Sequence, residues 1–174
     1  MSKTITLSLN KKLIFEAVKT DTFITGKVEI TTDGSQNAKV YNEQAGDDDF
    51  HERKLERTLR GSVGAFESLL TEFVDTSTGS ISDNLAAGND DFDITIVTSD
   101  RFLNGLAQPL ASLAQEFIIN RMIAQWWTAA KPELSQFYLA LSNDNIASVR
   151  RCLSKKAPTT TNGVDYVDVT GTVA

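Results

Sequence analysis

The chain has 174 residues, of which 41% are hydrophobic, and this length and composition indicate one domain with a modest core. Its formal net charge of −6 argues against free nucleic acid as the main partner, because phosphate binding needs a cationic face. The single cysteine, Cys152, excludes an intramolecular disulfide, and no apolar run reaches the roughly 20 residues of a membrane-spanning helix, so we expect a soluble protein in a reducing compartment with no membrane partner.

The first element is predicted to be a half-buried strand over residues 4–10. Apolar residues alternate there with polar ones, which is the period of a strand with one buried face: Ile5, Leu7 and Leu9. Asn10 can cap a helix over residues 11–24, and Gly26 suits the end of that helix. A strand or hairpin is then expected around Val28 and Ile30, followed by a polar segment over residues 31–46.

A charged helix is predicted over residues 47–75. Its apolar residues recur at steps of three and four and form one stripe: Leu55, Leu59, Val63, Phe66, Leu70, Phe73 and Val74. Gly61 and Gly64 each cost about 1 kcal/mol relative to alanine inside a helix. We therefore expect them to mark either a break in the helix or a close approach of another backbone.

Acidic residues gather around the only histidine at the start of this helix: Asp47, Asp48, Asp49, His51 and Glu52. The cluster lacks the alternate spacing and central glycine of an EF-hand loop, so we interpret it as a helix start stabilised by negative charge. No glycine-rich nucleophile turn accompanies His51, and Cys152 lies on an apolar helix face. We predict no catalytic residue, no metal site and no cofactor; a metal-dependent enzyme that uses the acidic cluster is the third hypothesis for function.

A loop is expected over residues 76–90, and a second strand follows it. Phe92, Ile94 and Ile96 would share the buried face of this strand, with Asp93 on the solvent side. Ser99 or Asp100 can cap the longest helix, over residues 101–131. Pro109 lacks an amide donor and should kink or restart that helix.

The longest helix carries the pair Trp126 and Trp127. Its apolar stripe holds the helical period: Leu106, Leu110, Leu113, Phe117, Ile118, Met122 and Trp126. Adjacent helix residues point about 100° apart, so Trp127 is expected at the edge of the stripe. The pair fits a wide buried face with one indole on its rim, a subunit contact, or a ligand pocket.

The last helix is predicted to begin at Pro132 and to form an antiparallel hairpin with the longest helix. Its packing side has seven members, with a possible break at residues 142–145: Leu134, Phe137, Tyr138, Leu141, Val149, Cys152 and Leu153. Four cations lie at its C-terminal end: Arg150, Arg151, Lys155 and Lys156. They either complement the helix dipole or form a basic patch for an acidic neighbour or for passing DNA.

Together these elements predict an α+β fold: a mainly helical bundle of three to four helices with a C-terminal helical hairpin, a small antiparallel β element and an extended C-terminal arm. Residues 1–156 would form a single domain and residues 157–174 the arm. Val167, Val169 and Val173 lie on one side of the arm, and an isolated strand is not stable in water. We expect the arm to pair with a sheet edge, either of its own chain or of a neighbouring subunit.

The residues expected at a subunit interface come from the tryptophan pair, the basic end of the last helix and the arm: Trp126, Trp127, Arg150, Arg151, Lys155, Lys156, Val164, Tyr166, Val167, Val169 and Val173.

The elements follow one another in this order: a first strand, a charged helix, a strand ending at an aromatic residue, and the segment "LAQPLASLAQEFIINRMIAQWWTA". In the order of its elements the chain resembles head-completion or head–tail connector proteins of tailed bacteriophages that infect gut Bacteroidetes. The resemblance covers residues 92–156 and includes Pro109, Leu110, Phe117 and the tryptophan pair. It implies a non-enzymatic virion protein that forms a homo-oligomeric ring, commonly twelvefold, between portal and tail proteins, with DNA only as passing cargo. The alternative hypothesis is a small acidic intracellular adaptor or regulatory domain that binds a protein partner.

Overall fold

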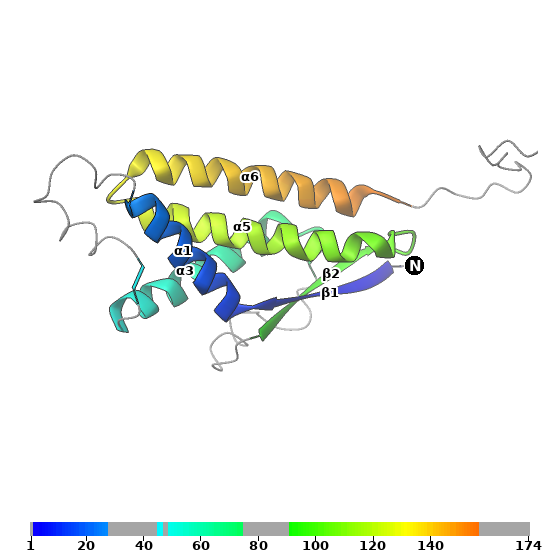
Figure 1. Ribbon diagram of the computed structural model, residues 1–174. Helices are drawn as coiled ribbons and strands as arrows, with labels where there is room; N and C mark the ends of the chain where they lie inside the picture. The colour runs from blue at the N-terminus through cyan, green and yellow to red at the C-terminus, as the bar shows by residue number, and fades with distance from the viewer. Residues whose placement is uncertain (1, 28–44, 47–48, 75–90, 157–174) are drawn as a thin grey trace, which may run out of the picture.

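The computed structural model describes residues 2–27, 45–46, 49–74 and 91–156 (Figure 1). The elements in chain order are β1 (Ser2–Asn10), α1 (Lys11–Lys27), α3 (Asp49–Leu69), β2 (Asp91–Ser99), the short 3-10 helix η3 (Asn104–Leu106), α5 (Ala107–Trp127) and α6 (Pro132–Ser154). The predicted class, α+β and mainly helical with a small antiparallel sheet, is confirmed. The predicted strand at Val28 and Ile30, most of the polar segment 31–46, the loop 76–90 and the arm 157–174 lie outside the described residues.

The two strands predicted from alternation pair with each other. β1 and β2 run antiparallel along their full length, with Ser2 opposite Ser99 and Asn10 opposite Asp91. The predicted apolar residues of both strands are buried on one face: Ile5, Leu7, Leu9, Phe92, Ile94 and Ile96. Asn10 caps α1 as predicted, because its Oδ1 accepts a hydrogen bond from the backbone N–H of Leu13 at 2.9 Å.

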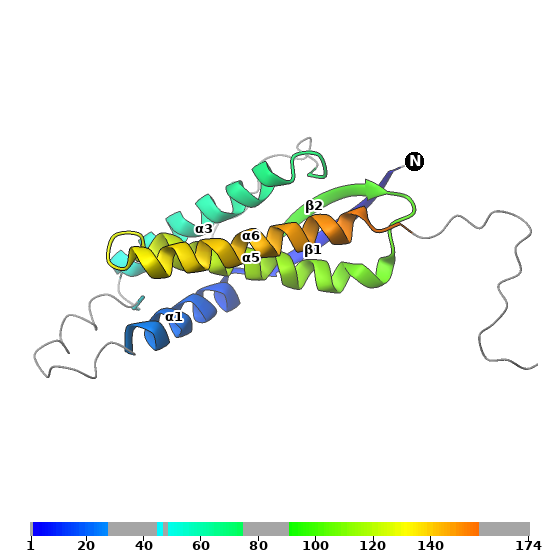
Figure 2. The same ribbon diagram turned by 90° about the horizontal axis from the view of Figure 1, so that it is seen from above.

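Helix α5 is the centre of the molecule. α6 runs along one side of it, and α1, α3 and the sheet pack on the other side (Figure 1). Seen from above, α1 and α3 lie on opposite sides of the α5–α6 pair (Figure 2). Because neighbours cover α5 on more than one side, its buried residues do not form a single stripe: Leu110, Ala114, Phe117, Ile118, Ile119, Asn120, Met122, Ile123, Ala124, Trp126 and Trp127.

The start of α5 differs from its predicted cap. Neither Ser99 nor Asp100 caps a helix; the carbonyl of Ser99 instead accepts a hydrogen bond from the N–H of Phe102 at 2.9 Å, which forms a turn. α5 begins at Ala107, so Pro109 lies in its first turn, where a backbone N–H has no partner inside the helix. The predicted restart of the helix near Pro109 is confirmed.

Helix α3 runs from Asp49 to Leu69 without a break, so a break at Gly61 or Gly64 is wrong. A Cβ added at Gly61 would lie 3.6 Å from Oε1 of Gln125, and one at Gly64 would have no described atom within 4 Å. The neighbour of Gly61 is therefore a side chain of α5 and not a backbone.

Helix α6 is continuous over 23 residues, so the predicted break at residues 142–145 is wrong. Ser142 is buried, and its Oγ donates a hydrogen bond to the carbonyl of Leu139 at 2.9 Å, which satisfies the hydroxyl inside the helix. Pro132 occupies the first turn as predicted. Phe137 is 57% exposed, so its predicted place on the packing side of the helix is wrong. Ser142 marks the buried side of α6, and Phe137 lies about 140° around the helix from it.

Candidate functional site

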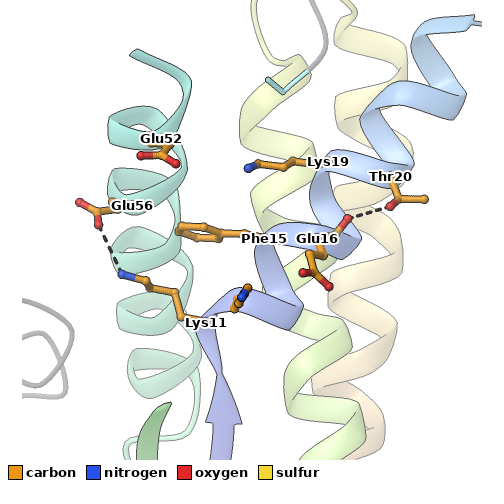
Figure 3. A pocket seen from close by; sticks show the side chains of 8 residues that line it. Lys11, Phe15, Glu16, Lys19, Thr20, Glu52 and Glu56 are labelled. Carbon is orange, nitrogen blue, oxygen red and sulfur yellow. Dashed lines mark hydrogen bonds and ion pairs between the residues drawn. The ribbon is translucent and has the colours of Figure 1, made fainter. Parts of the chain in front are cut away.

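A cleft of about 710 Å³ opens between α1 and α3 (Figure 3). We call it the α1–α3 cleft; it is lined by Lys11, Lys12, Phe15, Glu16, Lys19, Thr20, Glu52 and Glu56. The ring of Phe15 projects from α1 into the space between the two helices, and an ion pair of 3.4 Å between Lys11 Nζ and Glu56 Oε1 spans it (Figure 3).

The two walls of the α1–α3 cleft carry opposite charges. The α1 wall contributes three lysines and one carboxylate, Glu16, and is basic on balance, whereas the α3 wall contributes Glu52 and Glu56. Because charged side chains line both helices, the cleft suits a charged partner better than an apolar ligand. Of the residues that line the cleft, only Glu52 was singled out from the sequence, as part of the acidic cluster at the start of the charged helix. The spacing of residues within one helix does not reveal that two helices about 40 residues apart will lie side by side.

Trp126 is packed between two side chains of α3. The ammonium Nζ of Lys54 lies 3.8 Å from the centre of its ring, and the ring of His51 meets it edge-on at 5.3 Å. Burial, and then the charge of Arg57, lower the pKa of Lys54. Since only 4% of Trp126 is exposed, the predicted subunit contact through this indole is corrected to a contact within the chain.

His51 also holds the residues that precede α3. Its Nδ1 accepts a hydrogen bond from the backbone N–H of Gly46 at 3.1 Å. The N–H of Ala45 donates to Thr22 Oγ1 of α1 at 3.3 Å. Residues 45–46 are thus hydrogen-bonded to both α1 and α3.

Trp127 is fully buried, so its predicted position on the rim of the packing face is wrong. The physical reason is that α5 is covered on several sides, which places two residues about 100° apart inside the core together. The indole Nε1 has no hydrogen-bond partner among the described residues, and Lys131 Nζ lies 4.7 Å from the ring centre. With no exposed surface, this side chain offers no contact to a second subunit.

The predicted basic end of α6 divides into two parts. Nη2 of Arg150 donates a hydrogen bond to the backbone carbonyl of Leu69 at 2.6 Å, so Arg150 joins α6 to the end of α3. Arg151, Lys155 and Lys156 are exposed. The contact of these three cations with a partner stays a prediction.

The outer side of β1 presents backbone groups to solvent. Val97 of β2 points its N–H away from β1, toward the carbonyl of Phe73. Thr4 is opposite Val97 in the antiparallel pair, so the N–H and C=O of Thr4 also point away from β2. Because the direction of the backbone groups alternates along a strand, the N–H and C=O of Thr6 and Ser8 point outward as well. We call the outward backbone groups of Thr4, Thr6 and Ser8 the β1 edge. All three side chains are exposed, and no described residue forms a backbone hydrogen bond with this edge.

Across the ranges that the structure describes, no group of three or more His, Cys, Asp or Glu residues is gathered as a metal site. Asp47 and Asp48 of the acidic cluster lie outside those ranges. Cys152 is half-buried against the core. None of the described helices is long and apolar enough to cross a membrane.

No protein-family model, curated protein or solved structure matches the chain. Three surfaces of the described residues are open to a partner: the β1 edge, the α1–α3 cleft and the exposed cations at the end of α6.

Proposed function

We propose that the protein is a non-enzymatic structural subunit that assembles with copies of itself into a ring in the head–tail connector, or neck, of a tailed bacteriophage. The observation that carries this proposal is the β1 edge. Among the described residues the sheet has two strands and packs one face on α5, and the outward N–H and C=O groups of β1 form an edge that a further strand can join.

The sequence supplies a strand that suits this edge. Residues 164–173 place Val167, Val169 and Val173 on one side, and a strand added to a sheet gains main-chain hydrogen bonds as well as burial of such side chains. A contact between an edge and an arm uses two different surfaces of the same subunit. Contacts of this head-to-tail kind form rings when the rotation between copies closes.

The place in a phage neck rests on the sequence resemblance over residues 92–156. The α5–α6 hairpin, which that segment was expected to form, is present with Pro109 in its first turn. A net charge of −6 suits a ring around a DNA channel, because strong attraction would hinder DNA that has to pass.

Removal of residues 158–174 tests the proposal. We expect the shortened chain to keep the helical signal and the cooperative unfolding of the full chain but to stay monomeric over a concentration range in which the full chain forms rings, as measured by native mass spectrometry and electron microscopy. A full-length control with Val167, Val169 and Val173 changed to serine should fail to assemble in the same way. Assembly of the shortened chain like the full chain would contradict the proposal.

The α1–α3 cleft favours the adaptor as a second candidate function. Glu52 and Glu56 present an acidic wall to a basic partner. A lysine-rich peptide should then bind to a chain that is monomeric at all concentrations, and the double change Glu52→Gln and Glu56→Gln should abolish binding. Glu133→Gln, on α6, is the matched control, and equal loss in this control would remove the adaptor hypothesis.

A further inference from the structure

We infer that the β1 edge of one copy receives residues 164–173 of a second copy as an antiparallel strand. This inference rests on the proposed function and names the surface and the direction of its assembly contact. It goes further because the sequence leaves open whether the arm pairs with its own chain or with a neighbour.

The β1 edge is suited to accept a strand. Natural edge strands are commonly protected by lysine, proline or bulges. The one lysine of β1 is Lys3, whose Nζ donates a hydrogen bond to Oδ1 of Asn104, and β1 has no proline and no bulge. Its ladder with β2 is regular over nine residues, with no bulge in the register. An added strand would therefore find a straight row of outward N–H and C=O groups.

The side-chain pattern of the C-terminal segment matches the two faces of the sheet. On β1, Ile5, Leu7 and Leu9 face the core, and the side chains of Thr4, Thr6 and Ser8 face solvent. In residues 164–173, Val167, Val169 and Val173 share one face, and Val164, Tyr166, Asp168, Thr170 and Thr172 share the other. Residues 167–173 would extend the apolar face with valines and the solvent face with Asp168 and two threonines, and Val164 and Tyr166 would lie on the solvent face near Asn10.

The direction of pairing separates the own chain from a neighbour. Lys156 forms an isolated β-bridge with Phe102, and the N–H of Phe102 donates a hydrogen bond to the carbonyl of Ser99. Ser99 in turn is opposite Ser2 in the sheet. The chain therefore leaves α6 beside the Ser2 end of β1 (Figure 1). To pair antiparallel over the whole edge, residue 164 must lie near Asn10, which is eight residue steps or roughly 27 Å from Ser2. Eight steps also separate Lys156 from residue 164, and they span at most roughly 29 Å when fully extended.

The arm of the same chain could therefore pair antiparallel over the whole edge only with its linker almost fully extended, which costs conformational entropy. A neighbour's arm can approach from the Asn10 end without that constraint. Antiparallel pairing is slightly more stable per residue than parallel pairing, so the two points together favour the second copy. The donor's arm and the acceptor's edge are different surfaces, so each subunit can donate to one neighbour and accept from another.

Thr6→Pro in the full chain tests the surface. The N–H of Thr6 points away from β2, so proline removes an outward donor without removing a bond of the β1–β2 ladder, and edge positions tolerate proline. We expect the concentration for half-assembly to rise by about tenfold or more, the effect of losing roughly one hydrogen bond together with its neighbours. Thr6→Ala is the matched control and should stay within about twofold of the natural chain.

Cysteine pairs test the donor and keep the inference testable if Thr6→Pro disturbs folding. In a Cys152→Ala background, one tagged chain carries Thr6→Cys and a second carries Asp168→Cys, with Tyr166→Cys and Thr170→Cys tried in parallel for a register displaced by two residues. We expect disulfide-linked pairs of the two tags upon mild oxidation. Val169→Cys, on the opposite face, is the control and should link poorly.

The results separate this inference from the proposed function. If removal of residues 158–174 prevents assembly while Thr6→Pro assembles normally and no cysteine pair links two chains, the inference is overturned: the arm is needed for assembly, but it binds a surface other than the β1 edge. A single chain carrying both cysteines that links only internally would show that the arm pairs with its own sheet, which overturns the inference. If the full chain forms no assembly at all, the proposed function fails first.

Discussion

Nη2 of Arg150 on α6 donates a hydrogen bond of 2.6 Å to the backbone carbonyl of Leu69, the last residue of α3. Carbonyl groups in the last turn of a helix have no partner inside that helix. A charged donor from α6 satisfies one of them and joins two helices that contact α5 from different sides. The cation therefore complements the C-terminal end of α3 and not only that of its own helix.

Arg150→Met should lower the free energy of unfolding by about 1 kcal/mol, because it keeps the aliphatic part of the side chain and removes the donor to Leu69. Urea unfolding followed by circular dichroism measures the change. Arg151→Met, one residue along the same helix, is the control and should change the stability by less than about 0.5 kcal/mol. Equal losses in the two variants would assign the effect to general charge at the end of α6.

Trp127→Ala should be among the most destabilising single changes, at about 3–5 kcal/mol, because it empties a fully buried site. Trp127→Phe should cost much less, since the buried indole N–H has no described partner and its removal leaves no acceptor unpaired. Denaturant unfolding of the two variants checks the order. A loss below about 1 kcal/mol for the alanine variant would contradict a buried Trp127.

Gly61→Ala and Gly64→Ala should each stabilise α3, by about 0.5–1 kcal/mol, because alanine is the better helix former. The added methyl group at Gly61 would make ordinary contact with Gln125, and the one at Gly64 would meet no described atom. Thermal unfolding measures the gain. If either change instead blocks assembly of the full chain, that glycine lies against another copy.

Asp21 predicts a pH dependence of stability. Burial raises the pKa of its carboxyl group in the folded chain, so the folded state binds this proton more tightly than the unfolded state does. The contribution of Asp21 is then most favourable at acidic pH, and it declines as the pH rises from the unfolded pKa through the raised folded one. Asp21→Asn should accordingly raise the melting temperature at pH 7, and the difference from the natural chain should vanish near pH 3.

The same variant should change the titration of a tyrosine. Burial first, and then the charge of Asp21, raise the pKa of Tyr138. Asp21→Asn removes the second cause, so the pKa of Tyr138 should fall, which the phenolate absorbance measures with Tyr138→Phe as the reference. Glu16→Gln, an exposed carboxylate change on the same helix, is the control and should leave that titration in place.

The sequence pattern was sufficient to predict those features that depend only on residues close together in the chain. Alternation identified the buried faces of β1 and β2, Asn10 was recognised as the cap of α1, and Pro109 and Pro132 marked the first turns of α5 and α6. Each of these features depends on residues within a few positions of one another. The class of the fold follows from them.

Tertiary packing decided what local pattern could not. Both indoles of α5 are buried because partners cover that helix on several sides, and the hydroxyl of Ser142 is satisfied within α6, so no break occurs there. The α1–α3 cleft and the bond from Arg150 to Leu69 join residues distant in the chain. The sequence by itself determined the buried faces of the two strands and the starts of α1 and α6. Only the tertiary structure decided which surfaces remain open, because exposure depends on neighbours that long-range packing brings together.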